Sequence, residues 1–112
     1  MVTALDQPEK VKKIDKSNML SQLMKTPDYC QDAINRAKQV KVPKKLKPKN
    51  IVIAGMGGSA IGGEILKDWL RDELPISIEV CRDYTLPAFA NKNTLFFANS
   101  YSGNTEETLS AF

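Results

Sequence analysis

Two short loops of this chain carry residue types that could bind an anion. Residues 55–63 read GMGGSAIGG, and residues 99–105 read NSYSGNT. Each loop follows a short apolar run and precedes a stretch that predicts a helix. Glycine gives a ligand access to backbone N–H groups, and a helix N-terminus favours negative charge. We predict that both loops lie at the same edge of one parallel sheet and bind a phosphorylated ligand there.

The first loop supplies backbone donors and one hydroxyl. Gly55, Gly57 and Gly58 would turn backbone N–H groups toward a ligand without a Cβ in the way. Ser59 would add a hydroxyl at the start of the helix that follows. This loop is predicted to bind through its glycine backbone.

The second loop supplies hydroxyls in place of glycines. Ser100, Ser102 and Thr105 can each donate to a phosphate oxygen, and Gly103 permits a tight turn. The simpler interpretation is a helix cap, because Ser102 or Asn104 stands in a capping position. Three hydroxyls beside a glycine-rich loop favour phosphate binding over capping alone.

A dinucleotide site is the competing interpretation of the first loop. Residues 55–60 fit the pattern G-x-G-x-x-G/A between a strand and a helix. The acidic residue expected about 20 positions later could be Glu79 or Asp83. The second loop argues against this alternative, since a pyrophosphate already bound to the first loop does not need a further compact anion site.

The elements that position these loops follow an alternating strand and helix pattern. Residues 51–54, 76–81 and 94–98 predict three strands of a parallel sheet. A helical stretch from about Glu64 is expected between the first two. Its apolar stripe is predicted to pack on the sheet, and consists of Ile61, Ile65 and Trp69 with Leu66 and Leu70 beside them. Gly62 and Gly63 disfavour a helix by about 1 kcal/mol each, which predicts that another backbone passes close by.

The segment before the sheet predicts helices and a basic connector. Residues 16–25 suit a short amphipathic helix, and Thr26 is expected to cap a second helix that Pro27 and Asp28 open. Residues 41–49 contain five lysines and two prolines, which indicates a solvated connector. The alternative is a lysine that steers an anionic substrate toward the nearby sheet edge.

Composition excludes several classes of protein. The chain has 112 residues, is 42% hydrophobic and 26% charged, and has a net charge of +3, which is too small to indicate nucleic-acid binding. No apolar run reaches the roughly 18 residues of a membrane helix, and the sequence predicts a cytoplasmic protein with no membrane contact. Cys30 and Cys81 lack metal-ligand spacing, so no metal site is expected. There is no histidine, so chemistry that needs an imidazole cannot be completed within these residues.

Two segments are expected, residues 1–49 as a helical extension with its connector and residues 50–112 as the first part of an α/β domain. Residues 105–112 predict a helix of only about two turns. Three strands with so short a final helix leave apolar faces uncovered. We therefore expect an incomplete, Rossmann-like sheet flanked by helices, belonging to the N-terminal part of a longer polypeptide.

The two loops together resemble a known family. GGSAIGGE at residues 57–64 and SYSGNT at residues 100–105, with Tyr84 and Leu86-Pro87 between them, are similar to the sugar isomerase (SIS) family. More narrowly, they resemble its bifunctional phosphoglucose/phosphomannose isomerases. The resemblance runs from about Asn50 to the end, and the helical lead-in is also similar.

The resemblance implies a homodimer that interconverts glucose 6-phosphate or mannose 6-phosphate with fructose 6-phosphate through an enediol, without a cofactor. Ser100, Ser102 and Thr105 would hold the phosphate, and Gly58 and Ser59 would lie near the sugar, with Gly57 also in the substrate-binding set. The family's catalytic Glu, His and Lys belong to later segments, so residues 1–112 alone are expected to be inactive. Glu64 is expected to be structural. A phosphosugar-sensing SIS module without catalysis is the second hypothesis.

Overall fold

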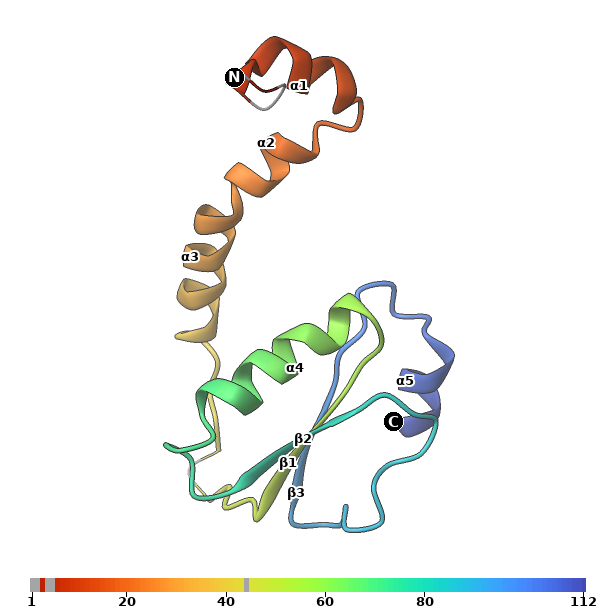
Figure 1. Cartoon of the computed structure of the whole chain (residues 1–112). Coiled ribbons are helices and arrows are strands. Elements are labelled where there is room, and N and C mark those ends of the chain that lie inside the picture. Colours follow the sequence, from red (N-terminus) through yellow and green to blue (C-terminus); the bar gives the residue numbers. More distant parts are fainter. Residues whose placement is uncertain (1–2, 4–5, 44) are drawn as a thin grey trace. The chain divides into compact units, whose positions relative to one another are not determined.

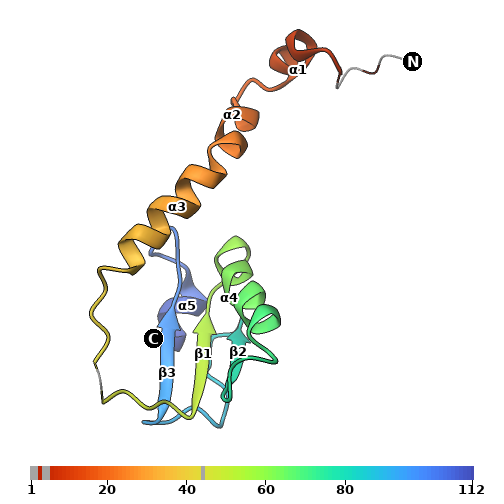
Figure 2. The same cartoon turned by 90° about the vertical axis from the view of Figure 1, so that its left-hand side faces the viewer.

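The computed structural model describes residue 3, residues 6–43 and residues 45–112 (Figures 1 and 2). The chain falls into two compact units, Met1–Pro43 and Lys44–Phe112. Among the described residues, the first unit contains three α-helices, and the second contains a sheet with a helix on each face. No helix in the described part of the chain is long and apolar enough to cross a membrane.

The N-terminal unit contains α1 (Pro8–Ile14), α2 (Met19–Met24) and α3 (Thr26–Ala37). The Asp15 carboxylate accepts the backbone N–H groups of Met19 at 2.7 Å and Leu20 at 2.8 Å, which satisfies the start of α2. These hydrogen bonds also hold the pKa of Asp15 below its usual value. The predicted short helix is thus confirmed, and its first free donors are met by a carboxylate before it.

The start of α3 differs slightly from expectation. Thr26 is the first helical residue, Lys25 is the N-cap, and no side chain caps this helix. The predicted Thr26 cap is therefore wrong, although Pro27 and Asp28 do lie in the first turn. Proline is favoured there because its missing N–H would have had no partner within the helix.

The three predicted strands are confirmed. They are β1 (Asn50–Ala54), β2 (Ser77–Cys81) and β3 (Thr94–Ala98), and they form a parallel sheet in the order β2-β1-β3. The register pairs Ala54 with Cys81 on one side and with Ala98 on the other. β1 is the central strand and has its last three residues buried, as a parallel strand covered on both faces requires.

Helices α4 (Gly58–Trp69) and α5 (Glu106–Ala111) lie on opposite faces of the sheet (Figures 1 and 2). Alternating β1 side chains meet them. A Cβ placed on Gly63 of α4 would lie 3.1 Å from Cγ2 of Ile53. Ala111 of α5 instead shares a buried cluster with Val52 and Ala54. This two-sided covering confirms the predicted α/β class, with helices flanking a parallel sheet.

The structure contradicts the predicted position and facing of α4. The helix begins at Gly58 rather than near Glu64, so residues 58–63 of the predicted glycine-rich loop belong to the first two turns of α4. Its apolar stripe faces outward, with Ile61, Ile65 and Trp69 exposed by 51%, 57% and 69%. The residues that α4 buries are Ala60 and Gly63. Small residues face the sheet because they let the helix backbone lie close to β1 and β2.

The two helical glycines have different surroundings. Gly63 lies against the side chains of Ile53 and Val80, so the expected close approach is to side chains of the sheet and not to a backbone. Within the part of the chain that the structure describes, nothing lies within 4 Å of a Cβ built on Gly62. The expectation of a close neighbour is therefore wrong for Gly62.

This difference gives a test of the α4 geometry. Gly62→Ala should raise the free energy of unfolding by about 0.5–1 kcal/mol, because alanine favours the helix and meets no obstacle here. Gly57→Ala is the control and should lower it by about 1 kcal/mol, because Gly57 has φ +52°. Urea denaturation of both variants measures the two changes. A destabilising Gly62→Ala would show that α4 is not placed as described.

Candidate functional site

The two loops lie side by side at the carboxyl edge of the sheet. β1 and β3 are neighbouring parallel strands, so the chain leaves both at the same edge (Figure 2). The backbone N–H of Asn99 donates to the Ala54 carbonyl at 2.8 Å, which extends the pairing past the end of β3. The predicted juxtaposition is confirmed. In this sheet order the two loops come from adjacent strands.

The first loop needs glycine at two positions for different reasons. Gly57 has φ +52°, in the left-handed region that side chains disfavour. A Cβ on Gly55 would lie only 2.9 Å from the carbonyl oxygen of Asn99. The backbone of the first loop therefore lies directly against the backbone that follows β3.

Ser59 connects the first loop with the second. Its carbonyl accepts the side-chain amide of Asn99 at 2.7 Å, and its Oγ accepts the backbone N–H of Tyr101 at 3.3 Å. A hollow of about 540 Å³ lies beside this junction. Its lining residues are Met56, Gly58, Ser59, Asn99 and Tyr101. The structure thus brings Gly58 and Ser59 to a cavity shared with the second loop.

Asn99 is a residue of this site that the sequence did not single out. It is the first residue after β3. Its backbone N–H donates to the Ala54 carbonyl, and its side-chain amide donates to the Ser59 carbonyl. An asparagine directly after a strand was a usable signal, because its amide can reach backbone groups of a neighbouring loop. The sequence contains no indication that its partner is Ser59, 40 positions earlier.

The hydroxyls of the second loop converge. Thr105 Oγ1 lies 3.0 Å from Ser100 Oγ and 3.4 Å from Ser102 Oγ. Ser100 Oγ also accepts the backbone N–H of Gly103 at 3.1 Å, and Gly103 has φ +68°. The turn at Gly103 therefore folds the loop back so that all three predicted hydroxyls form one cluster.

These hydroxyls do not cap α5. The N-cap is Thr105, and the helix start has no side-chain capping hydrogen bond. The predicted caps at Ser102 and Asn104 are wrong: Ser102 Oγ instead accepts the N–H of Asn104, at 3.2 Å, within the loop itself. The three hydroxyls bond to one another and to backbone N–H groups of their own loop.

The charges around the second loop are acidic. Neither loop contains Lys or Arg, whereas Glu106 and Glu107 open α5. The Tyr84 hydroxyl lies 3.5 Å from the Glu106 carboxylate. The negative charges of Glu107 and Glu106 raise the pKa of Tyr84 above its usual value, which keeps that hydroxyl protonated. An anion bound here would be held by neutral N–H and O–H donors.

The other carboxylates considered from the sequence are engaged elsewhere. Glu64 pairs with Arg82 at 3.1 Å, which fits the structural role expected for it. Glu79 pairs with Lys67 of α4 at 2.9 Å, and this ion pair raises the pKa of Lys67. Glu79 also lies within β2, not at its carboxyl end. This placement does not favour Glu79 as the ribose-binding acid of a dinucleotide site.

The basic connector reaches the opposite edge of the sheet. Residues 45–49 lead into the amino end of β1, where the Lys49 N–H donates to the Asn93 carbonyl at 2.9 Å. A hollow of about 260 Å³ there is lined in part by Lys45, Lys47 and Lys92. Lys45, Lys47 and Lys49 are exposed, as the predicted solvated connector requires. These lysines give no support to the alternative of a lysine beside the loops.

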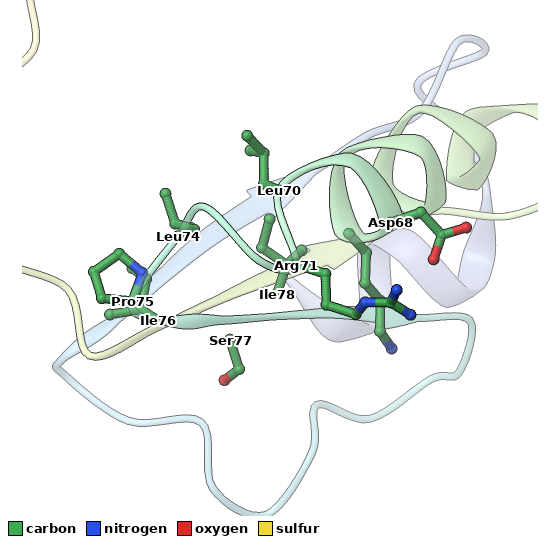
Figure 3. Close-up of a pocket in the computed structure, with 9 residues that line it drawn as sticks. Asp68, Leu70, Arg71, Leu74, Pro75, Ile76, Ser77 and Ile78 are labelled. Carbon is green, nitrogen blue, oxygen red and sulfur yellow. The ribbon is translucent and has the colours of Figure 1, made fainter.

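A further hollow also lies away from the loops. It measures about 480 Å³ and is formed by the end of α4, the turn after it and the start of β2 (Figure 3). Leu70, Leu74 and Pro75 give it an apolar wall beside Arg71. Among residues 3, 6–43 and 45–112, no three His, Cys, Asp or Glu side chains are grouped so as to hold a metal ion. The loop edge, with its convergent donors, is the candidate site.

Comparisons with curated proteins give several relatives. A bifunctional phosphoglucose/phosphomannose isomerase of Caldicellulosiruptor bescii is 44% identical over 95 residues, which cover 84% of this chain and 28% of that protein. The isomerase of the same description from Thermoplasma acidophilum is 56% identical over 62 residues, covering 55% of this chain and 19% of that protein. A D-glucosamine-6-phosphate 4-epimerase of Sulfolobus acidocaldarius is 39% identical over 82 residues, covering 73% and 24%.

No protein-family model and no solved structure matches the chain. The chain spans 28% or less of the length of these three relatives. Within the aligned spans the identity is 39–56%. Over most of its length, this chain is homologous to the bifunctional phosphoglucose/phosphomannose isomerases.

Proposed function

We propose that this chain supplies the loops that bind a hexose 6-phosphate in a phosphoglucose/phosphomannose isomerase. The observation that carries the proposal is the cluster of Ser100, Ser102 and Thr105 hydroxyls at the carboxyl edge of the sheet. The names of the relatives support the proposal independently of the geometry. The isomerases and the D-glucosamine-6-phosphate epimerase differ in reaction, and a phosphorylated hexose is common to their names.

The hydroxyl cluster suits a phosphate because its donors are neutral and close together. At 3.0 Å and 3.4 Å, the three oxygens share hydrogen bonds with one another. A phosphate oxygen is a stronger acceptor than a hydroxyl, since hydrogen bonds to a charged group are shorter and about twice as strong. The bound phosphate would take over these donors. We place the sugar toward the hollow lined by Gly58 and Ser59, with Gly57 shaping the turn before them.

The proposed reaction moves a proton between C1 and C2 of the open-chain sugar through an enediol. It needs ring opening and a base whose pKa lies near the working pH. Glu64 is held by Arg82, and Glu106 lies beside the Tyr84 hydroxyl, so neither is a free base at the loop edge. The printed sequence has no histidine. The resemblance to the isomerases implies a catalytic Glu, His and Lys in later segments, and we assign residues 1–112 to substrate binding, without a cofactor.

A phosphosugar-sensing module is the alternative, because the same loops would serve binding without turnover. For the dinucleotide interpretation, Glu79 is paired with Lys67, whereas Asp83 follows β2 and accepts the Tyr84 N–H at 2.6 Å. The hydroxyl cluster of the second loop still favours a phosphosugar. A homodimer and a cytoplasmic location remain predictions. Measurement of turnover separates the isomerase from the sensor.

The first test removes the hydroxyl cluster. In the whole protein, Ser100→Ala/Ser102→Ala/Thr105→Ala should lower kcat/KM for glucose 6-phosphate and mannose 6-phosphate at least about 100-fold, because hydrogen bonds to a charged group are lost. A coupled assay for fructose 6-phosphate measures this change. Ser77→Ala, an exposed hydroxyl at the opposite edge of the sheet, is the control and should leave turnover unchanged. Full activity in the triple variant would refute the phosphate assignment.

The wild-type whole protein also decides between the two functions. Turnover of both sugars establishes the isomerase. Saturable binding of glucose 6-phosphate without turnover, lost in the triple variant, would instead establish the sensor. Binding of neither sugar phosphate would contradict both.

The second test asks whether residues 1–112 alone catalyse the isomerisation. A polypeptide of residues 1–112 should show no isomerase activity in the same assay, because it lacks the proposed base and histidine. Addition of the whole protein to the same cuvette is the control for the assay. Turnover by residues 1–112 alone would overturn the placement of the catalytic groups.

A further inference from the structure

We propose that Asn99 is a positioning residue that holds the Ser59 hydroxyl in place for the sugar. This inference rests on the proposed function, because it assigns a role within the same site. Asn99 acts through Ser59 and not by its own contact with the ligand. Its effect should therefore concern the sugar half of the site and leave the phosphate half intact.

Asn99 is itself held firmly by the sheet. Its backbone N–H donates to the Ala54 carbonyl at 2.8 Å. A Cβ built on Gly55 would lie 2.9 Å from the carbonyl oxygen of Asn99, so the two backbones are in contact. The start of the side chain is thus fixed relative to β1. A side chain anchored in this way can position a partner at little further entropic cost.

The amide of Asn99 can bond to Ser59 in one orientation only. The partner atom is the Ser59 carbonyl oxygen at 2.7 Å, which accepts and cannot donate. The NH₂ group must therefore face it. This bond ties the first turn of α4 to the loop after β3, because Ser59 is the second residue of that helix.

The Ser59 hydroxyl is held by a second bond to the same loop, two residues after Asn99. Its oxygen accepts the Tyr101 N–H at 3.3 Å, and its backbone N–H donates to the Met56 carbonyl at 3.0 Å. A serine oxygen that accepts one hydrogen bond still has its own proton to donate. Ser59 lines the hollow together with Gly58, Asn99 and Tyr101, and an acceptor in this hollow can meet that proton. A sugar hydroxyl oxygen has the required chemistry. Because Asn99 borders the same hollow, the test must separate an effect through Ser59 from a direct contact.

The two halves of the site are thereby kept at a fixed separation. The phosphate donors belong to the loop after β3, and Ser59 belongs to the helix after β1. A ligand that bonds to both gains affinity only if their spacing is set before it binds. The Asn99–Ser59 bond sets that spacing across 40 positions of sequence.

The test compares two asparagines that make the same kind of bond. Asn91 donates its side-chain amide to the Phe89 carbonyl at 2.9 Å, at the opposite edge of the sheet. In the whole protein, Asn99→Ala should weaken glucose 6-phosphate binding about tenfold and change inorganic phosphate binding less than about twofold, since one hydrogen bond is lost. Asn91→Ala should change neither. Calorimetric titration with each ligand gives the dissociation constants.

A double-mutant comparison tests whether the effect passes through Ser59. In a Ser59→Ala background there is no hydroxyl left to orient, so adding Asn99→Ala should weaken glucose 6-phosphate binding by less than about twofold. If the two substitutions instead multiply, Asn99 contacts the ligand directly and the proposal is wrong. Should Asn99→Ala not fold, Asn99→Leu keeps a similar shape and removes the amide donor without adding a charge, and the same comparison with Ser59→Ala decides.

The remaining outcomes also distinguish the hypotheses. Equal weakening of phosphate and glucose 6-phosphate by Asn99→Ala would indicate general loosening of the site and overturn the positioning role. An Asn99→Ala protein that binds like Asn91→Ala would overturn it as well. If wild-type protein binds neither ligand, the proposed function itself fails. Failure of the positioning role leaves wild-type binding and its loss in the hydroxyl triple variant intact.

Discussion

The parallel pairing of β3 with β1 is the constraint on which the site depends. It places the ends of both strands at one edge and continues into the Asn99 N–H bond to the Ala54 carbonyl, at 2.8 Å. The contact is so close that a Cβ on Gly55 would lie 2.9 Å from the Asn99 carbonyl. Separation of these strands would remove both the hollow at Ser59 and its connection to the hydroxyl loop.

The site that results relies on neutral donors. Its hydroxyls and backbone N–H groups stand beside Glu106 and Glu107, and neither loop contains Lys or Arg. Neutral donors in fixed positions bind through geometry more than through net charge. Such donors favour an anion whose oxygens match the spacing of the hydroxyl cluster. Long-range electrostatic attraction then contributes little to binding. The basic residues Lys45 and Lys47 of the connector lie at the other edge of the sheet, away from the candidate site.

The sequence predicted the strands and the loops better than the helices. Short apolar runs bounded by turn residues gave all three strands, and the parallel order followed from the strand and helix alternation. The prediction of which α4 face packs on the sheet was wrong, because we expected the apolar stripe to be that face. Ala60 and Gly63 face it instead, since a close helix needs small residues there. The caps at Ser102 and Asn104 were wrong because Thr105 is the N-cap of α5, and Ser102 Oγ accepts the backbone N–H of Asn104 instead.

The sequence by itself determined which chemical groups are present: glycine backbone, the Ser100, Ser102 and Thr105 hydroxyls, and no histidine. It also determined that they follow strands, because local hydrophobic pattern is enough to predict a strand. Only the tertiary structure decided that the hydroxyls cluster around Thr105 and that Asn99 bonds to Ser59. The physical reason is that these contacts depend on strand register and helix placement, which join residues 40 positions apart and leave no periodic trace along the chain.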